Sequence, residues 1–140
     1  MDCCGWLCAK GRTWYAACGA YMMQAATYIA VFRLPERRRI QVGKLGSFRF
    51  EPGVYFYVGS AQRNLPARLE RHARKEKPLR WHIDYLSTKA HMIGAMIVPG
   101  PRERECELAR ELGLMYEMAV PGFGASDCRC GGHLFYARDL

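Results

Sequence analysis

Runs of β-branched and aromatic residues, separated by turn residues, follow one another in the first half of the chain. Four such runs lie at residues 27–34, 39–42, 47–50 and 54–58. Proline and glycine mark the turns, most sharply at Pro52-Gly53, as is typical of strand boundaries. Because the connections are too short to contain crossover helices, the pattern predicts an antiparallel meander.

The second half of the chain changes to a helical period. Leu65 and Leu69 stand four residues apart and Pro66 suits a first helical turn, so we expect a helix over residues 64–77. The elements expected further along are a short helix at 81–89, a buried strand at 92–98, an amphipathic helix at 102–112, a glycine-rich loop at 121–132 and a last strand at 134–137. Gly113 is expected to end the amphipathic helix as its C′ residue. The pattern therefore predicts an α/β (α+β) domain with a small, mainly antiparallel central sheet flanked by helices.

The first 21 residues show no clear period of hydrophobic positions. They contain Cys3, Cys4, Cys8 and Cys18, so this segment could be a metal-binding or redox appendage. A mis-assigned start codon, with the protein beginning at Met22 or Met23, is the preferred interpretation. We therefore expect a Cys-rich extension over residues 1–21 and one domain over residues 22–140.

The composition excludes several classes of protein. Half of the 140 residues are hydrophobic and 24% are charged, which is typical of a globular domain and not of a disordered, collagen-like or coiled-coil chain. The longest apolar runs are far shorter than the ~20 residues of a membrane-spanning helix. The beginning of the chain lacks a convincing secretory signal, so we expect a cytoplasmic location, where disulfides are rare.

The charge of the chain narrows the choice of partner. Lys and Arg number 21 against 13 Asp and Glu, which gives a formal net charge of +8. A positive field attracts polyanions and speeds their association, so nucleic acid is a natural partner to consider. On the helix expected at 64–77, one face would carry Arg68, Arg71, His72 and Lys75. A basic surface without a specific partner is the alternative.

Short motifs around two tyrosines resemble those of a known enzyme family. Ala26-Thr27-Tyr28 resembles the first motif of the GIY-YIG nucleases, Tyr57-Val58-Gly59 resembles the second, and Ala67-Arg68-Leu69 is similar to the arginine segment that follows. The first motif departs from Gly-Ile-Tyr at its first two positions. Further blocks are similar to a largely prokaryotic subgroup often called Uri-type endonucleases: Trp81–Leu86, Glu105–Ala109, Gly122–Cys130 and Gly132–Tyr136. The resemblance runs from about Thr27 to Tyr136.

The resemblance implies an endonuclease that hydrolyses DNA phosphodiester bonds, in repair or recombination, with Mg²⁺ or Mn²⁺ as its cofactor. Tyr28 would be the base, although a free phenol has a pKa of about 10 and needs nearby cations or metal-bound water to ionise at neutral pH. Arg68 would clamp the phosphate. Tyr57 would position water or substrate, and His72 would add a donor or shuttle a proton.

A carboxylate of the helix at 102–112 would hold the metal. Mg²⁺ takes oxygen ligands and often uses only one or two carboxylates. The block Glu105-Cys106-Glu107 offers two, of which we expect Glu107 first and Glu105 second. The candidates for contact with nucleic acid are Ser60, Arg71, Lys75, His82 and His133.

Cys128, Cys130 and His133 lie close together near the end of the chain, and Cys106 could be a fourth ligand. Thiolates and imidazole suit Zn²⁺, but the spacing Cys-x-Cys-x₂-His differs from the usual Cys-x₂-Cys. Structural zinc, and a disulfide involving Cys128 or Cys130, are therefore alternatives to the preferred interpretation, a packed loop that borders the active cleft.

Each functional assignment has a structural alternative. Tyr28 and Tyr57 could simply fill a half-buried sheet, Trp81 could be a core residue, and Asp84 could cap a helix or form a salt bridge. Two other functions also stay open. One is a nucleic-acid-binding domain that has lost turnover, since phosphate contacts alone supply affinity, and the other is a zinc- or redox-dependent regulatory domain. The sequence does not distinguish single-stranded, branched or damaged DNA from RNA, nor one oligomeric state from another.

Overall fold

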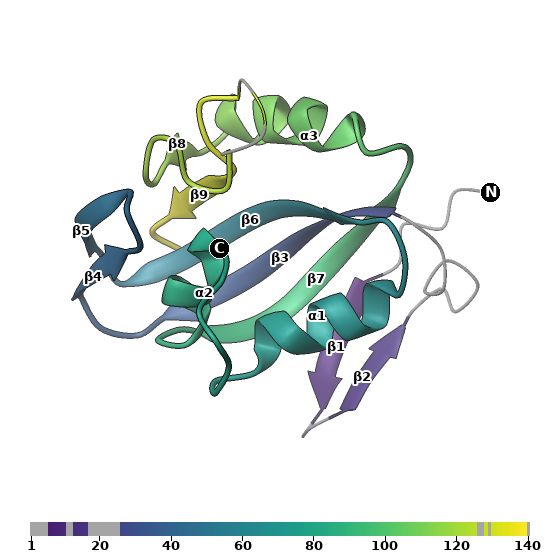
Figure 1. Ribbon diagram of the computed structural model, residues 1–140, viewed down its shortest axis with the longest axis horizontal. Coiled ribbons are helices and arrows are strands. Elements are labelled where there is room, and N and C mark those ends of the chain that lie inside the picture. Colours follow the sequence, from purple (N-terminus) through teal and green to yellow (C-terminus); the bar gives the residue numbers. More distant parts are fainter. Residues whose placement is uncertain (1–5, 11–12, 17–25, 126–127, 129, 140) are drawn as a thin grey trace.

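The computed structural model describes residues 6–10, 13–16, 26–125, 128 and 130–139 (Figure 1). They form a mixed α+β fold, as expected. The strands are β1 (Trp6–Lys10), β2 (Thr13–Ala16), β3 (Ala26–Leu34), β4 (Arg38–Val42), β5 (Gly46–Phe50), β6 (Gly53–Ala61), β7 (His91–Pro99), β8 (Glu117–Met118) and β9 (Leu134–Ala137). The helices are α1 (Leu65–Ala73), α2 (His82–Ser87) and α3 (Arg104–Gly113).

One antiparallel sheet dominates the fold, with the strand order β2-β1-β7-β3-β6-β9-β8. The central strand β3 pairs with β6 on one side and with β7 on the other. Its side chains alternate between two cores. Tyr28 and Phe32 pack in the core that α1 and α2 complete, and Ile29 and Val31 pack in the core that α3 completes. Figure 1 shows α1 and α3 on opposite sides of these strands.

The expected four-stranded meander is wrong. Strands β4 and β5 pair with each other as a separate two-stranded sheet, and β6 pairs directly with β3 along its whole length, from Gly53 to Ala61. The reason is strand length. β3 and β6 have nine residues each, whereas β4 and β5 have five, so a short neighbour would leave part of the buried β3 backbone without hydrogen bonds.

Helix α1 begins as predicted and ends earlier than predicted. The side chain of Asn64 caps it by accepting from the backbone N–H of Ala67 at 3.3 Å. The helix stops at Ala73 rather than at Lys77, because Arg74 adopts an extended conformation. The buried Lys77 ammonium then folds back and donates to carbonyl oxygens of the last helical turn, at 2.7 and 3.1 Å, which satisfies groups that a helix end leaves without partners.

Gly113 does not act as a C′ residue, because it is the last residue of α3. Leu114 follows in a right-handed conformation, with φ −80° and ψ −20°. The chain continues in a tight turn, in which the N–H groups of Met115 and Tyr116 donate to the Leu112 carbonyl at 3.0 and 2.8 Å. No left-handed residue is therefore needed to satisfy this carbonyl.

Strands β1 and β2 were not predicted from the sequence. They form a hairpin, and β1 extends the sheet by pairing with β7 at Trp6↔Met96 and Leu7↔Ala95. The start suggested at Met22 or Met23 falls outside the described residues and stays a prediction. Among the helices of the described chain, none is long and apolar enough to cross a membrane.

Candidate active site and metal cluster

A cleft of about 360 Å³ opens beside β6, near the point where its neighbour β9 ends. Strand β9 pairs with β6 only from Val54 to Tyr57. Beyond Tyr57, the His133 carbonyl accepts from the Val58 N–H at 3.0 Å, and the rest of this edge borders the cleft. Predicted site residues from β3, β6, α1, α2 and α3 line it together: Tyr28, Tyr57, Ser60, Arg68, His82 and Glu105.

Tyr28 lies at the base of the cleft and is 1% exposed. It stands opposite Gly59 in the ladder between β3 and β6, and a Cβ atom at Gly59 would lie 2.6 Å from its hydroxyl oxygen. The glycine of the second motif therefore makes room for the tyrosine of the first. Burial and the neighbouring Tyr57 raise the pKa of Tyr28 well above its usual value of 10, and Arg68 only partly opposes this. The desolvation of Tyr28 thus outweighs the positive charge of Arg68, which would be needed to stabilise a phenolate base.

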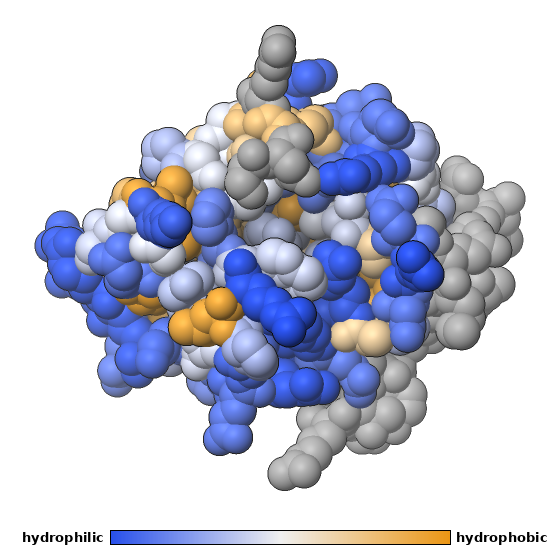
Figure 2. All heavy atoms as spheres, in the orientation of Figure 1, coloured by the Kyte–Doolittle hydropathy of each residue, from blue (hydrophilic) through white to orange (hydrophobic). Residues whose placement is uncertain are grey.

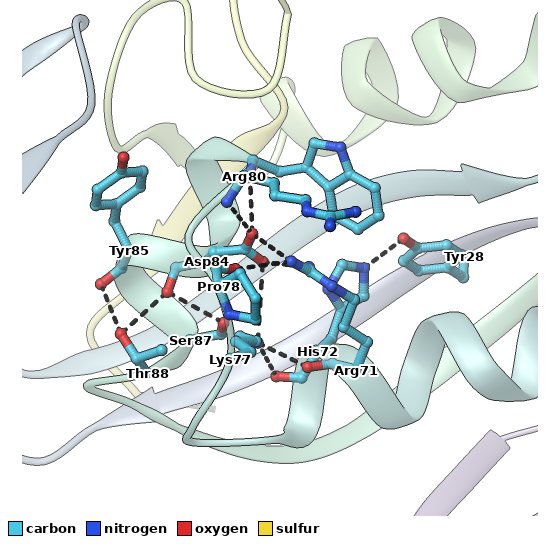
Figure 3. A network of polar contacts seen from close by, with 11 residues as sticks. Tyr28, Arg71, His72, Lys77, Pro78, Arg80, Asp84, Tyr85, Ser87 and Thr88 are labelled. Carbon is cyan, nitrogen blue, oxygen red and sulfur yellow. Dashed lines mark hydrogen bonds and ion pairs between the residues drawn. The ribbon is translucent and has the colours of Figure 1, made fainter.

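The Tyr28 hydroxyl is hydrogen-bonded to Nε2 of His72 at 2.6 Å (Figure 3). His72 is 1% exposed, and burial, together with the charges of Lys77 and Arg68, lowers its pKa to about 3. Both groups are therefore neutral at pH 7. His72 does not contribute a charge to the predicted basic face of α1, because it points into the core.

Arg68 and Arg71 leave α1 in different directions. The Arg68 guanidinium lies 4.5 Å from the centre of the Trp81 ring and donates to the Ser60 carbonyl at 3.3 Å, at the wall of the cleft. The Arg71 guanidinium lies 4.3 Å from the same ring but forms a bidentate ion pair with Asp84, at 2.6 and 2.9 Å. Arg68 is thus available to a ligand in the cleft, whereas Arg71 has a structural partner.

Asp84 holds α2 against α1, as Figure 3 shows. Its buried carboxylate accepts from Arg71 and from the backbone N–H groups of Arg80 and Trp81, at 2.8 and 2.9 Å. Burial favours the neutral acid, but these hydrogen bonds prevail and lower the pKa of Asp84. Asp84 therefore both caps a helix and forms a salt bridge, and it fixes the position of Trp81.

The other predicted nucleic-acid contacts are divided between the cleft and the rest of the structure. His82 lies at the cleft, where its Nδ1 accepts from the Gly124 N–H at 2.9 Å, so the neutral ring carries its proton on Nε2. Burial lowers the pKa of His82. Lys75 lies beyond the end of α1 and donates to the Ala90 carbonyl. His133 is 1% exposed and lies behind Glu105 rather than at the cleft wall.

The two candidate metal carboxylates are also separated. Glu105 lines the cleft, and its Oε2 lies 3.4 Å from the Ser60 hydroxyl, which donates to it. Glu107 does not line the cleft and pairs with Arg104 at 3.0 Å on the exposed side of α3. Residues two apart on a helix point in different directions. Glu105, the second choice from the sequence, is therefore the carboxylate that lies at the cleft, and the expected first choice, Glu107, lies away from it.

A second cluster of ligand-type side chains lies next to Glu105. The cluster consists of Cys106, Cys128, Cys130 and His133. Each of these residues has one potential ligand atom, and these four atoms all lie within 4.8 Å of one another. The three cysteines are free thiols, so the disulfide alternative is not formed in this structure. Burial and the two other thiols raise the pKa of Cys130 to about 12. This group could hold a metal ion such as zinc, and Cys106 is the fourth member that the sequence suggested.

Sequence reasoning missed several residues of the cleft: Gln62, Arg80, Trp81, Arg102 and Gly124. Trp81 is 38% exposed and stacks on arginines rather than filling a core. Its position next to the basic residue Arg80 was the available signal. Three arginines and one glutamate line the cleft, so its charge is positive. Figure 2 shows hydrophilic residues over most of the face that carries α1.

Comparison with known proteins identifies one family. A family model described as a domain of unknown function, DUF123, matches residues 27–140. The match begins one residue before Tyr28 and contains every residue of the cleft and of the cysteine–histidine cluster. No curated protein and no solved structure matches the chain.

Proposed function

We propose that this chain, which belongs to the DUF123 family, is a divalent-metal-dependent endonuclease of GIY-YIG type that hydrolyses DNA phosphodiester bonds. One observation carries the proposal: Tyr28, Tyr57, Arg68 and Glu105 come from four different elements and line one cleft. The sequence motifs suggest the first three, and they give Glu105 as the second choice of metal carboxylate after Glu107. A phosphoryl-transfer site needs a phosphate clamp, a group that handles the proton of water and a metal-binding carboxylate, and the cleft offers one candidate for each.

The oxygen atoms in the cleft fit a hard cation. Glu105 supplies a carboxylate and Ser60 a hydroxyl, and Mg²⁺ commonly uses one or two carboxylates and keeps several waters. Glu105 would hold Mg²⁺ or Mn²⁺. When bound, the cation would supply positive charge to the phosphate and lower the pKa of water.

Arg68 is the phosphate clamp in this proposal. Its guanidinium rests on the Trp81 ring at 4.5 Å and donates one N–H to the Ser60 carbonyl at 3.3 Å. These contacts restrict its orientation, and its other N–H groups would bind the phosphate oxygens. Arg80 and Arg102 add positive charge around the cleft. The substrate's negative charge would thus be balanced before and during bond cleavage.

Tyr28 acts in this scheme as a neutral phenol rather than as a preformed phenolate. Its proton can pass to Nε2 of His72 at 2.6 Å while its oxygen accepts the proton of the attacking water. Burial is the main cause that lowers the pKa of His72, and the charges of Lys77 and Arg68 add to it. A bound phosphate would offset the contribution of Arg68, and to that extent His72 becomes a better proton acceptor when the substrate is present.

The proposed substrate is DNA, because the positive cleft suits a phosphate backbone. Contacts to phosphate carry no sequence information, so we expect the enzyme to select DNA by its shape. The proposed role is repair or recombination in the cytoplasm. RNA is the competing substrate to include in every assay.

The test is cleavage of labelled single-stranded, duplex and branched DNA, and of RNA, by the purified chain with Mg²⁺, Mn²⁺ or EDTA. We expect metal-dependent products that Arg68→Ala reduces by about 10²–10³-fold, the usual effect of removing a transition-state donor. Glu105→Gln should abolish cleavage and retain binding, while the matched variant Glu107→Gln should cleave normally. If no nucleic acid is cut but all are bound in a salt-sensitive way, the chain is a binding domain and the catalytic proposal fails.

A further inference from the structure

We propose that this chain binds one structural zinc ion, and that the ion positions the carboxylate at the cleft. The ligands are Cys106, Cys128, Cys130 and His133, and the carboxylate is Glu105. The zinc site stands independently of the proposed function, whereas the positioning of Glu105 rests on it.

The ligand atoms already have nearly the spacing of a zinc site. Tetrahedral zinc has Zn–S bonds of about 2.3 Å and Zn–N bonds of about 2.0 Å, which separate two sulfurs by about 3.8 Å and a sulfur from a nitrogen by about 3.5 Å. Sγ of Cys128 and Nε2 of His133 are 3.5 Å apart, and all four ligand atoms lie within 4.8 Å of one another. Small rotations of the side chains would complete the tetrahedron.

Backbone contacts hold His133 and the residues between Cys130 and His133 in place without the metal. The Gly122 N–H donates to the Gly131 carbonyl at 2.7 Å, and the His133 N–H donates to the Phe123 carbonyl at 2.7 Å. A Cβ atom at Gly132 would lie 3.1 Å from the Val120 carbonyl oxygen, so the segment between Cys130 and His133 is closely packed. Such a preformed arrangement reduces the entropy lost when a metal binds.

The donor set selects zinc over the cation of the cleft. Three thiolates and one imidazole form a soft, four-ligand set that closes a tetrahedral site, whereas Mg²⁺ requires oxygen. Metal can reach the cluster, because Cys106 and Cys130 border a second open cavity of about 570 Å³. The ion would tie the loop that follows β8 to the first turn of α3.

His133 connects this cluster to the cleft. With Nε2 on the metal, the ring carries its proton on Nδ1, and Nδ1 lies 3.6 Å from Oε1 of Glu105. This buried atom has no other hydrogen-bond partner in the described chain. The free ring N–H of a zinc-bound histidine usually donates to a carboxylate or carbonyl. Zinc would therefore fix the tautomer of His133 and, through it, orient Glu105, whose other oxygen faces Ser60.

The zinc content of the purified full chain tests the site. We expect one equivalent to be lost in Cys128→Ser and retained in Cys8→Ser, a control that changes a cysteine of the first 21 residues. Replacement by Co²⁺ should give thiolate-to-cobalt charge-transfer absorption that weakens in the Cys128 variant and not in the Cys8 variant. A zinc content that does not depend on Cys128, or a disulfide within the cluster under reducing conditions, would overturn the proposal.

The variant His133→Cys tests the positioning of Glu105, because it keeps a fourth zinc ligand and removes the Nδ1–H donor. We expect it to retain zinc and a wild-type circular dichroism spectrum, and to bind Mn²⁺ about 10–100-fold more weakly by electron paramagnetic resonance, the usual effect of losing such a partner. Unchanged Mn²⁺ affinity would refute the positioning role. If wild-type chain binds zinc but neither binds Mn²⁺ nor cleaves DNA, the proposed function and the positioning fail together while the zinc site stands.

Discussion

Substitution of Gly59 by alanine should disrupt the contact on which the candidate active site is built. Gly59 lies opposite Tyr28 in the β3–β6 ladder. A Cβ atom there would lie 2.6 Å from the Tyr28 hydroxyl oxygen and 2.7 Å from its Cζ. Gly59 has no positive φ, so backbone strain does not contribute, and the whole effect comes from the collision with the tyrosine ring.

The size of the effect follows from how firmly Tyr28 is held. The ring is 1% exposed and its hydroxyl bonds to His72 at 2.6 Å, so it must move about 1 Å within a packed core. Overpacking of this kind costs about 1–3 kcal/mol, and weakening of a buried hydrogen bond adds about 1 kcal/mol. We expect Gly59→Ala to lower the free energy of unfolding by about 2–4 kcal/mol in total.

Urea unfolding followed by circular dichroism measures this loss. Gly113→Ala is the matched control, because its Cβ would contact only Phe135, at 3.4 Å, and alanine in a helix should gain up to about 1 kcal/mol. In a Tyr28→Leu background the collision is gone, so the cost of Gly59→Ala should fall below about 1 kcal/mol. The reasoning is refuted if Gly59→Ala is as stable as Gly113→Ala, or if its cost persists beside Tyr28→Leu.

Three further predictions concern the network behind the cleft. The pKa of His72 is lowered to about 3 in the folded chain, against about 6.5 in the unfolded chain. Protons therefore bind the unfolded chain more tightly, and the free energy of unfolding falls by up to about 5 kcal/mol as the pH drops from 6.5 towards 3. His72→Gln should flatten the dependence of the unfolding free energy on pH between 7 and 4, and an equally steep curve would contradict the assignment. Asp84→Asn leaves the Arg71 charge without its partner and should cost about 3 kcal/mol at pH 7. Since the pKa of Asp84 is lowered, the difference from wild type should shrink only below about pH 4, which melting curves at pH 7 and pH 3 can check. Lys77→Met removes the donor to two carbonyls at the end of α1 and should cost about 1–2 kcal/mol, whereas Lys44→Met at an exposed position should change the melting temperature little.

Local patterns in the sequence predicted most helices and strands from residue 27 onward, but they did not predict which distant strands pair with each other. The last strand was expected at 134–137, where β9 lies, because its alternation and the glycine-rich loop before it are local signals. The direct pairing of β3 with β6 was missed. This pairing depends on the lengths of two strands that a hairpin separates in the sequence. A local stretch of sequence does not include both strands, so local patterns do not predict the pairing.

The choice between Glu105 and Glu107 had a signal that could have been used. Leu108, Ala109 and Leu112 form the buried face of α3, and Glu105 precedes them at i−3, i−4 and i−7. Glu105 therefore starts the face that packs on the sheet, while Glu107 lies away from it. The carboxylate nearest the core was the better candidate, because a functional side chain must reach a concave site rather than open solvent.

The cysteine cluster shows what spacing alone conceals. Cys-x-Cys-x₂-His supplies three ligands from one segment, and the fourth candidate, Cys106, comes from another element, α3. Glu105 and Cys106 are consecutive, and a helix turns successive side chains by about 100°, so one helical turn supplies an oxygen ligand to the cleft and a thiolate to the cluster. The loop that carries the other ligands ends at His133, whose carbonyl makes the last backbone bond to β6 before the cleft edge. An ion that ties this loop to α3 would therefore stabilise both the carboxylate and the strand edge beside which the cleft opens.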